Sequence, residues 1–225
     1  MSERFSSSAV CVALSTERLQ PYRLVNSSDA AVLRAYRDNI RLSEALYPIM
    51  QQLEVVFRNQ LEQALLRDYG AQWFTNPKFQ AVLDGVANRK LADAVQMLTR
   101  KKPFVTSGMV VAELTFGFWT TLLDTRYDQY IWIPHGKNLF SRATATERNI
   151  KKIRQKLDLI RRLRNRIAHH EPIWNDPDLL SKYQTLKRLL KWMNPYAASW
   201  LERNRLDRFL SVHVTIFNPK PRVKQ

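Results

Sequence analysis

Apolar residues recur at helical spacing along most of this 225-residue chain, and this periodicity constrains the fold more than any other feature. Leu53, Phe57, Leu61 and Leu65 are each four positions apart, so they share one face of a helix. The chain contains only 5 glycines, which disfavours β-sandwiches, β-barrels and glycine-rich phosphate loops. Residues 212–217 are the one strand-like stretch. The sequence therefore predicts an all-α fold of about six to eight helices.

Capping and breaking residues position the expected helices. Asp29 is suited to cap a helix that runs to residue 46, and Pro48 is suited to begin a second helix that ends near Gly70. Further helices are expected over residues 83–99, 109–124, 146–169, 176–191 and 194–210. The stretch 109–124 can be one buried helix or a pair broken near Gly117. Residues 127–140 contain a proline and a glycine and are expected to form a loop or short turns.

Composition and periodicity divide the chain into three parts. Residues 1–28 are rich in serine and lack a long periodic pattern, so we expect a flexible leader. Residues 29–215 are expected to form a single all-α domain, because no repeat or low-complexity linker interrupts them. Residues 216–225 form a basic tail.

Positive charge is concentrated in the second half of the chain. Residues 1–100 hold 12 Lys and Arg against 10 Asp and Glu, whereas residues 101–225 hold 24 against 10. The total formal charge is +16. An excess of this sign on one half favours a polyanionic partner such as RNA. A solvated basic surface without a partner is the alternative interpretation.

Cysteine content and hydropathy indicate the cellular compartment in which the protein is expected. Cys11 is the only cysteine, which excludes an intrachain disulfide framework and a cysteine-rich zinc site. No apolar run approaches the ~18 residues that a membrane helix requires. We therefore expect a cytoplasmic protein that has no membrane association, and we predict neither a cofactor nor a metal site.

The helix expected over residues 146–169 carries the most unusual pattern. Ile153, Leu157, Ile160 and Ile167 fall in one stripe, and Arg164 lies within about 40° of its centre. The neighbouring polar face includes Asn165 and His169, which are four positions apart. Pro172 should end the helix near His169 and His170. Histidines at such an end act either as simple C-terminal caps or as proton carriers, and spacing alone leaves both open.

Three blocks resemble those of the Abi-like abortive-infection proteins, which belong to the HEPN ribonuclease superfamily. They are LRNRIAHHEPIW at residues 163–174, LEVVFRNQL at 53–61 and AELTFGFWTTLL at 112–123, in family order. The superfamily motif is an arginine, usually a polar residue, a short spacer and a histidine. Here it corresponds to Arg164, Asn165 and His169. His170 follows directly, so the spacer is four or five residues, and His169 is favoured because it shares a face with Asn165.

The resemblance implies an all-α, HEPN-type helical bundle with additional helices, a homodimer, and a toxin-like role in phage defence through metal-independent RNA cleavage. The expected reaction is attack of a ribose 2′-OH on the adjacent phosphate, giving 2′,3′-cyclic phosphate and 5′-OH ends. His169 would act as general base or acid, Arg164 would hold the phosphate, and Asn165 would orient either of them. A regulatory non-coding RNA is a further expected partner.

Two groups of residues are expected to support this site. The first is Glu54, Arg58 or Asn59, one of which should reach Arg164; an ordinary exposed Glu54–Arg58 pair is the alternative. The second is a basic track for the phosphate backbone, made of Lys151, Lys152, Arg154, Arg161, Arg162 and Arg166.

Two other function classes remain open at this point. The same basic face could belong to a non-catalytic RNA-binding protein, or to a toxin/antitoxin-type interaction module that meets an acidic partner. Base stacking by the aromatic residues of the 112–123 block and Trp132 is a weaker hypothesis than their burial in the core.

Overall fold

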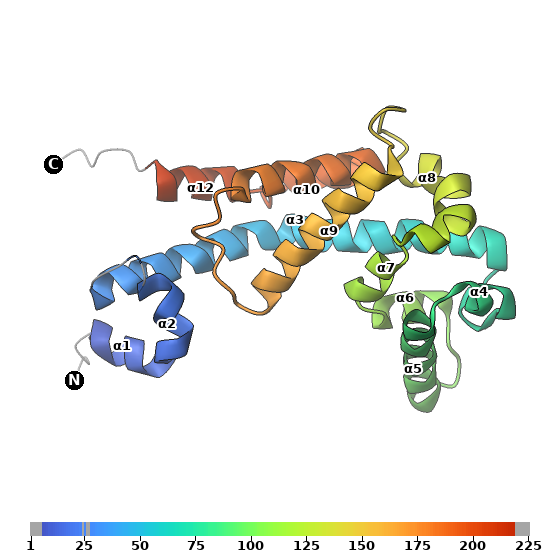
Figure 1. The fold of residues 1–225 in the computed structure, drawn as a ribbon, viewed down its shortest axis with the longest axis horizontal. Coiled ribbons are helices and arrows are strands. Elements are labelled where there is room, and N and C mark those ends of the chain that lie inside the picture. Colours follow the sequence, from blue (N-terminus) through green and yellow to red (C-terminus); the bar gives the residue numbers. More distant parts are fainter. Residues whose placement is uncertain (1–5, 24, 26–27, 219–225) are drawn as a thin grey trace.

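The computed structural model describes residues 6–23, 25 and 28–218 of the chain, and every regular element within them is helical. The predicted all-α class is confirmed. One long helix, α3 (Asp29–Tyr69), runs through the molecule, and α10 (Leu179–Met193) and α12 (Phe209–Phe217) lie along it (Figure 1). Helix α9 (Ile150–Ala168) crosses this layer at an angle, while the elements formed by residues 73–139 gather at the C-terminal end of α3 (Figure 1).

Helix α3 is continuous over 41 residues, although the sequence predicted a break before Pro48. Proline removes one backbone donor and usually kinks a helix. Here Leu46, Ile49 and Met50 on either side of it are all buried, so packing of the apolar stripe holds both halves in one helix. The cap also lies one residue earlier than expected, because the Ser28 hydroxyl accepts a hydrogen bond from the amide of Ala31 at 3.3 Å.

The N-terminal region differs from the expected loose leader. Residues Ser7–Leu14 form α1 and Thr16–Arg23 form α2, and both pack on the first turns of α3 (Figure 1). A small core joins them, made of Cys11, Leu19, Tyr22, Val32 and Ala35. The remaining leader residues, 1–5, 24, 26 and 27, lie outside the described part of the chain. Packing against a helix that follows in the sequence orders these segments despite their weak periodicity.

The central region contains more helix than the sequence indicated. Helix α5 (Gly85–Lys101) is close to its predicted position, and the 109–124 stretch is a pair, α6 (Ser107–Glu113) and α7 (Phe116–Thr121). Residues 127–140 were expected to form a loop or short turns; they form a π-helical turn (Asp128–Trp132) followed directly by the short helix α8 (Ile133–Leu139). The proline is tolerated because it lies in the first turn of α8, where its missing donor breaks no helical bond. The short elements between α3 and α5 are a 3-10 turn (Trp73–Thr75) and α4 (Pro77–Val82), and a second 3-10 turn (Thr125–Tyr127) precedes the π turn.

The C-terminal region also corrects one prediction. The strand-like residues 212–217 belong to α12, which follows α11 (Pro195–Arg203). Phe209, His213 and Phe217 are spaced by four, and the ring of Phe209 stacks on Tyr183 of α10 with centroids 4.6 Å apart. The β-branched residues between them are accommodated in a helix because α12 packs on α3, while Phe209 at its start packs on α10. The described residues end at 218, so most of the predicted basic tail lies beyond them.

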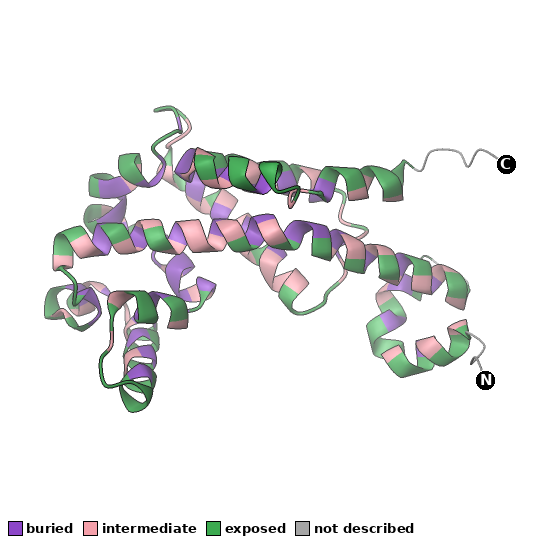
Figure 2. Cartoon of the chain, turned by 180° about the vertical axis from the view of Figure 1, so that it is seen from behind, coloured by how far each residue is buried: buried purple, intermediate pink, exposed green. Residues whose placement is uncertain are grey.

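Buried residues follow α3 along most of its length (Figure 2). Helix α9 adds Ile153, Leu157, Ile160 and Leu163 to this main core. Three of these four belong to the stripe that the sequence predicted, whereas Ile167 at the helix end is only partly buried. The last turn of α9 therefore emerges from the core beside the middle of α3.

Candidate functional site

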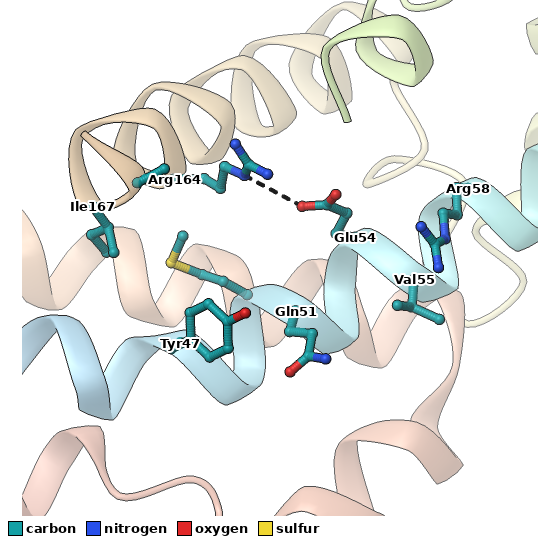
Figure 3. A pocket seen from close by; sticks show the side chains of 9 residues that line it. Tyr47, Gln51, Glu54, Val55, Arg58, Arg164 and Ile167 are labelled. Atoms are coloured by element: carbon teal, nitrogen blue, oxygen red, sulfur yellow. Dashed lines mark ion pairs between the residues drawn. The ribbon is translucent and has the colours of Figure 1, made fainter. Parts of the chain in front are cut away.

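Arg164 lies where α9 leaves the core and faces α3. Its Nε is 3.4 Å from Oε2 of Glu54, and the two side chains are 40% and 22% exposed (Figure 3). Of the three residues from which one was expected to reach Arg164, Glu54 makes this contact, and its supporting role stays a prediction. The ion pair uses the Nε edge of the guanidinium, which leaves the two terminal nitrogens as donors for another anion.

A cavity of about 390 Å³ surrounds this pair, and we call it the arginine pocket. Its walls come from α3 and from the end of α9: Tyr47, Met50, Gln51, Glu54, Val55, Arg58, Arg164, Ile167 and Ala168. Two arginines against one glutamate give it a net positive charge. Arg58 lines the pocket, and its buried Nε has no hydrogen-bond partner among the described residues.

Asn59 does not join this group. It is exposed, and on an ideal helix it lies about 140° around α3 from Glu54. It is absent from the lining of the arginine pocket. Of the three supporting candidates, the structure thus brings Glu54 to Arg164, places Arg58 in the lining of the same pocket and leaves Asn59 on another face.

The two histidines follow at the end of α9, where the sequence placed them. The amide of His170 donates to the carbonyl of Ile167 at 3.0 Å, and the amide of Glu171 donates to that of Arg166 at 2.8 Å. This pair of bonds is a Schellman motif, which requires a left-handed residue after the cap. His170 fills that position with φ of 57°, while His169 is the cap with φ of −90°. Both side chains are exposed.

Asn165 is half-buried one turn before His169, and its backbone carbonyl accepts the amide of His169 at 2.9 Å. On α9, Asn165 and His169 therefore lie one above the other, as the spacing predicted. The orienting role of the Asn165 side chain stays a prediction.

Sequence reasoning missed Arg18. This residue of α2 donates from Nη1 to the carbonyl of His170 at 2.8 Å and to that of His169 at 3.5 Å. A cation is favourable at the carbonyl end of a helix. The contact ties the N-terminal helices to the motif, but a separation of about 150 residues leaves no local signal that could have revealed it.

Asn39 of α3 was missed for the same reason. It is only 4% exposed, and its Oδ1 accepts the backbone amides of Ile173 at 2.6 Å and Trp174 at 3.2 Å. This contact anchors the segment that follows the two histidines, so the end of the motif is fixed against α3 as well as by α9.

The predicted basic track is only partly available to a ligand. Arg154 is 16% exposed; it pairs with Asp128 and donates to the carbonyls of Leu123 and Asp124. Burial lowers the pKa of this guanidinium. Arg154 therefore fastens α9 to the residues after α7, and the structure removes it from the exposed surface.

The other track arginines have acidic neighbours but keep more exposure. Arg161 and Arg162 both bind Asp158, each at 2.7 Å. Partial burial acts to raise the pKa of Asp158, but hydrogen bonds from the two arginines outweigh it and lower that pKa. Arg166 contacts Asp176 at 3.2 Å and the carbonyl of Pro172. Lys151 and Lys152 are exposed at the start of α9.

Metal-binding clusters and membrane-spanning helices are both absent from the described residues. No group of three or more His, Cys, Asp or Glu side chains in that part of the chain is arranged to hold a metal ion. None of the helices found there has the length and apolar content needed to cross a membrane.

Comparisons with known proteins agree with the resemblance seen in the sequence. No curated protein and no solved structure matched the chain. A family model described as Abi-like protein matches residues 12–175, which is well over half of the chain. The match includes α3 and α9, and thus both members of the Glu54–Arg164 pair. The chain therefore belongs to the Abi-like protein family.

Proposed function

We propose that the protein is a metal-independent endoribonuclease of the HEPN type that acts in abortive infection, as a toxin that damages RNA. The observation that carries this proposal is the state of Arg164. Its guanidinium is held by Glu54 at the mouth of a positively charged pocket, with two exposed histidines at the end of the same helix. Family membership supports the role in abortive infection.

The chemistry follows from these groups. The 2′-oxygen of a ribose forms a bond to the adjacent phosphorus, and the bond from phosphorus to the 5′-oxygen breaks. His169 carries out one of the two proton transfers, accepting the proton of the 2′-OH or donating one to the leaving 5′-oxygen, and water carries out the other. The terminal nitrogens of Arg164 bind the phosphate oxygens, whose negative charge increases in the transition state. The products carry a 2′,3′-cyclic phosphate and a 5′-OH.

A second copy of the chain completes the site in this proposal. Arg164 and His169 lie about 140° apart on an ideal helix. Arg164 faces the arginine pocket, and His169 is exposed outside it. Two α9 helices related by a two-fold axis would let Arg164 of one chain and His169 of the other meet at one phosphate.

The test is cleavage of mixed RNA by the purified protein in the presence of EDTA, with His169→Ala prepared identically. Cleavage that persists in EDTA, yields 5′-OH ends and stops in His169→Ala supports the proposal. The variant also controls for host nucleases, which would cut in both preparations. Strict dependence on added metal would refute the proposal. Salt-sensitive RNA binding without new 5′-OH ends would identify a non-catalytic RNA-binding protein instead.

A further inference from the structure

A second cavity adjoins the arginine pocket. It measures about 580 Å³ and lies between α3 and the end of α9; we call it the tyrosine pocket. Its lining includes Tyr36, Asn39, Ile40, Tyr47, Ile167 and His170. Tyr47, Ile167 and Ala168 line both cavities, so the two are neighbours that share one wall.

The two cavities differ in charge. The arginine pocket has two arginines and one glutamate. In the tyrosine pocket the charged residues of the lining are Glu44 and Arg208, and these pair with each other at 3.0 Å. The first cavity therefore suits an anionic group and the second suits a neutral, largely apolar one. A nucleotide has both parts, a phosphate and a base.

Asn39 supplies a fixed polar group in the tyrosine pocket. Its Oδ1 accepts two backbone amides, which holds the side-chain amide in one orientation. No hydrogen bond from its Nδ2 occurs within the described residues, although the side chain is 4% exposed and lines the cavity. Nδ2 is not among the buried side-chain atoms of the described residues that lack a partner, so this donor reaches the cavity and is not sealed inside the protein. An acceptor on a bound ligand would satisfy it.

Tyr47 supplies an aromatic surface on the shared wall. It is 59% exposed and lines both cavities. The ring lies on the same side of α3 as Gln51 (Figure 3), and Ile167 joins Tyr47 in the lining of both cavities. The stacking candidates that the sequence offered, Phe116, Phe118, Trp119 and Trp132, are all buried in the core. Among these aromatic residues, only Tyr47 is placed to meet a base.

We propose that the tyrosine pocket binds one nucleobase of the RNA, next to the phosphate held by Arg164. Tyr47 stacks on the base, and Nδ2 of Asn39 donates a hydrogen bond to a ring nitrogen or carbonyl oxygen of it. The cavity volume falls within the range of small-ligand sites. The identity of the ligand in this proposal rests on the proposed ribonuclease function. Base binding in this pocket would determine which nucleotide the protein prefers at the cleavage site.

The experiment uses short 2′-O-methyl RNA, which cannot be cleaved, with one abasic position moved along the strand. Affinity for the full-length protein is measured by fluorescence anisotropy. At one position the missing base should weaken binding to wild-type protein by about tenfold. Tyr47→Ala should remove this difference between intact and abasic RNA. Tyr47→Phe keeps the ring and should retain it.

A second variant tests the hydrogen bond. Asn39→Asp keeps the oxygen that accepts the amides of Ile173 and Trp174 and replaces the donor with an acceptor. It should weaken binding of intact RNA more than binding of RNA abasic at the sensitive position, because the added negative charge repels both probes and only the intact one loses the hydrogen bond. Thermal melting verifies that the variant is folded. If it is not, the Tyr47 variants decide the matter alone, because that side chain is exposed.

Two results would overturn the proposal. One is an abasic effect of the same size in wild-type protein and Tyr47→Ala. The other is a Tyr47→Ala protein that no longer dimerises and binds intact and abasic RNA equally weakly, which would make the cavity an interface between chains. Because the RNA probe is not cut, binding and cleavage are separable. If Tyr47 recognises a base but the protein never cleaves RNA, the proposed ribonuclease function is wrong and the proposed base-binding role of the tyrosine pocket stands.

Discussion

The carboxylate of Glu54 positions the guanidinium of Arg164. We expect this contact to affect the rate of cleavage more than the stability of the fold. We expect Glu54→Gln to lower kcat about tenfold, because Arg164 loses the partner that fixes its direction toward the phosphate. The free energy of unfolding should change by no more than about 1 kcal/mol, as for other solvent-accessible ion pairs. The measurement is cleavage rate at saturating RNA together with the melting temperature.

Asp38→Asn is the matched control for this prediction. Asp38 also lies on α3 and pairs with Arg37 at 3.0 Å, but it lines neither pocket of the site. It should leave kcat unchanged. A Glu54→Gln protein with wild-type kcat and melting temperature would make the Glu54–Arg164 pair an ordinary surface contact.

His170 is a second residue whose backbone sets its behaviour. With φ of 57° it occupies a conformation that L residues adopt at a cost and glycine adopts freely. We expect His170→Gly to stabilise the protein by about 1 kcal/mol, which raises the melting temperature by roughly 2–4 °C in a chain of this size. His169→Gly, at φ of −90°, should give no such gain. Equal melting temperatures for the two glycine variants would contradict this account of the motif.

At the scale of the element, α9 carries basic residues with different tasks. Arg154 joins α9 to Asp128 and to two backbone carbonyls. Arg154→Met should therefore lower the free energy of unfolding by about 2 kcal/mol, because Asp128 and the carbonyls lose a largely buried donor. Chemical denaturation measures this effect. If the Arg154→Met protein is as stable as wild type but binds RNA more weakly, Arg154 contacts the RNA backbone as the sequence predicted.

Lys151 and Lys152 are the exposed members at the start of the same helix. Replacing both with glutamate should weaken binding to all RNA sequences alike and flatten the dependence of log Kd on log salt by ~0.7 for each phosphate that the protein no longer binds. Lys101→Glu with Lys102→Glu makes the same change of charge at the exposed end of α5 and is the control. If both double variants weaken binding equally, net charge rather than a track on α9 attracts RNA.

At the scale of the whole molecule, the proposed composite site predicts complementation between two inactive proteins. Arg164→Ala and His169→Ala should each be inactive alone. After mixing with subunit exchange, half of the dimers are heterodimers, and one of the two clefts in each has both intact groups. About one quarter of wild-type activity should therefore return. RNA cleavage after co-refolding measures it, and no recovery despite proven heterodimers would place each cleft within one chain.

Local sequence was sufficient for the helical class and for the course of the site helix. Periodicity depends on residues three and four apart, so the buried stripe of α9 and its end before Pro172 were readable. The motif blocks also included Arg164 and Glu54 among the candidate site residues, although a sequence says nothing of the distance between two side chains. Short-range patterns failed where packing overrode them, at Pro48 inside α3, in the N-terminal helices and in α12.

Only the tertiary structure decided which polar groups are engaged and which remain free. Arg154 and Lys151 look alike in sequence, yet one is fastened to Asp128 and the other is exposed. Arg18 and Asn39 reach the motif from more than 130 residues away. A helical pattern states which face of a helix is buried, but the partner of a charged or amide side chain depends on how distant helices cross. That crossing is set by the packing of the whole core, which no local window of the sequence contains.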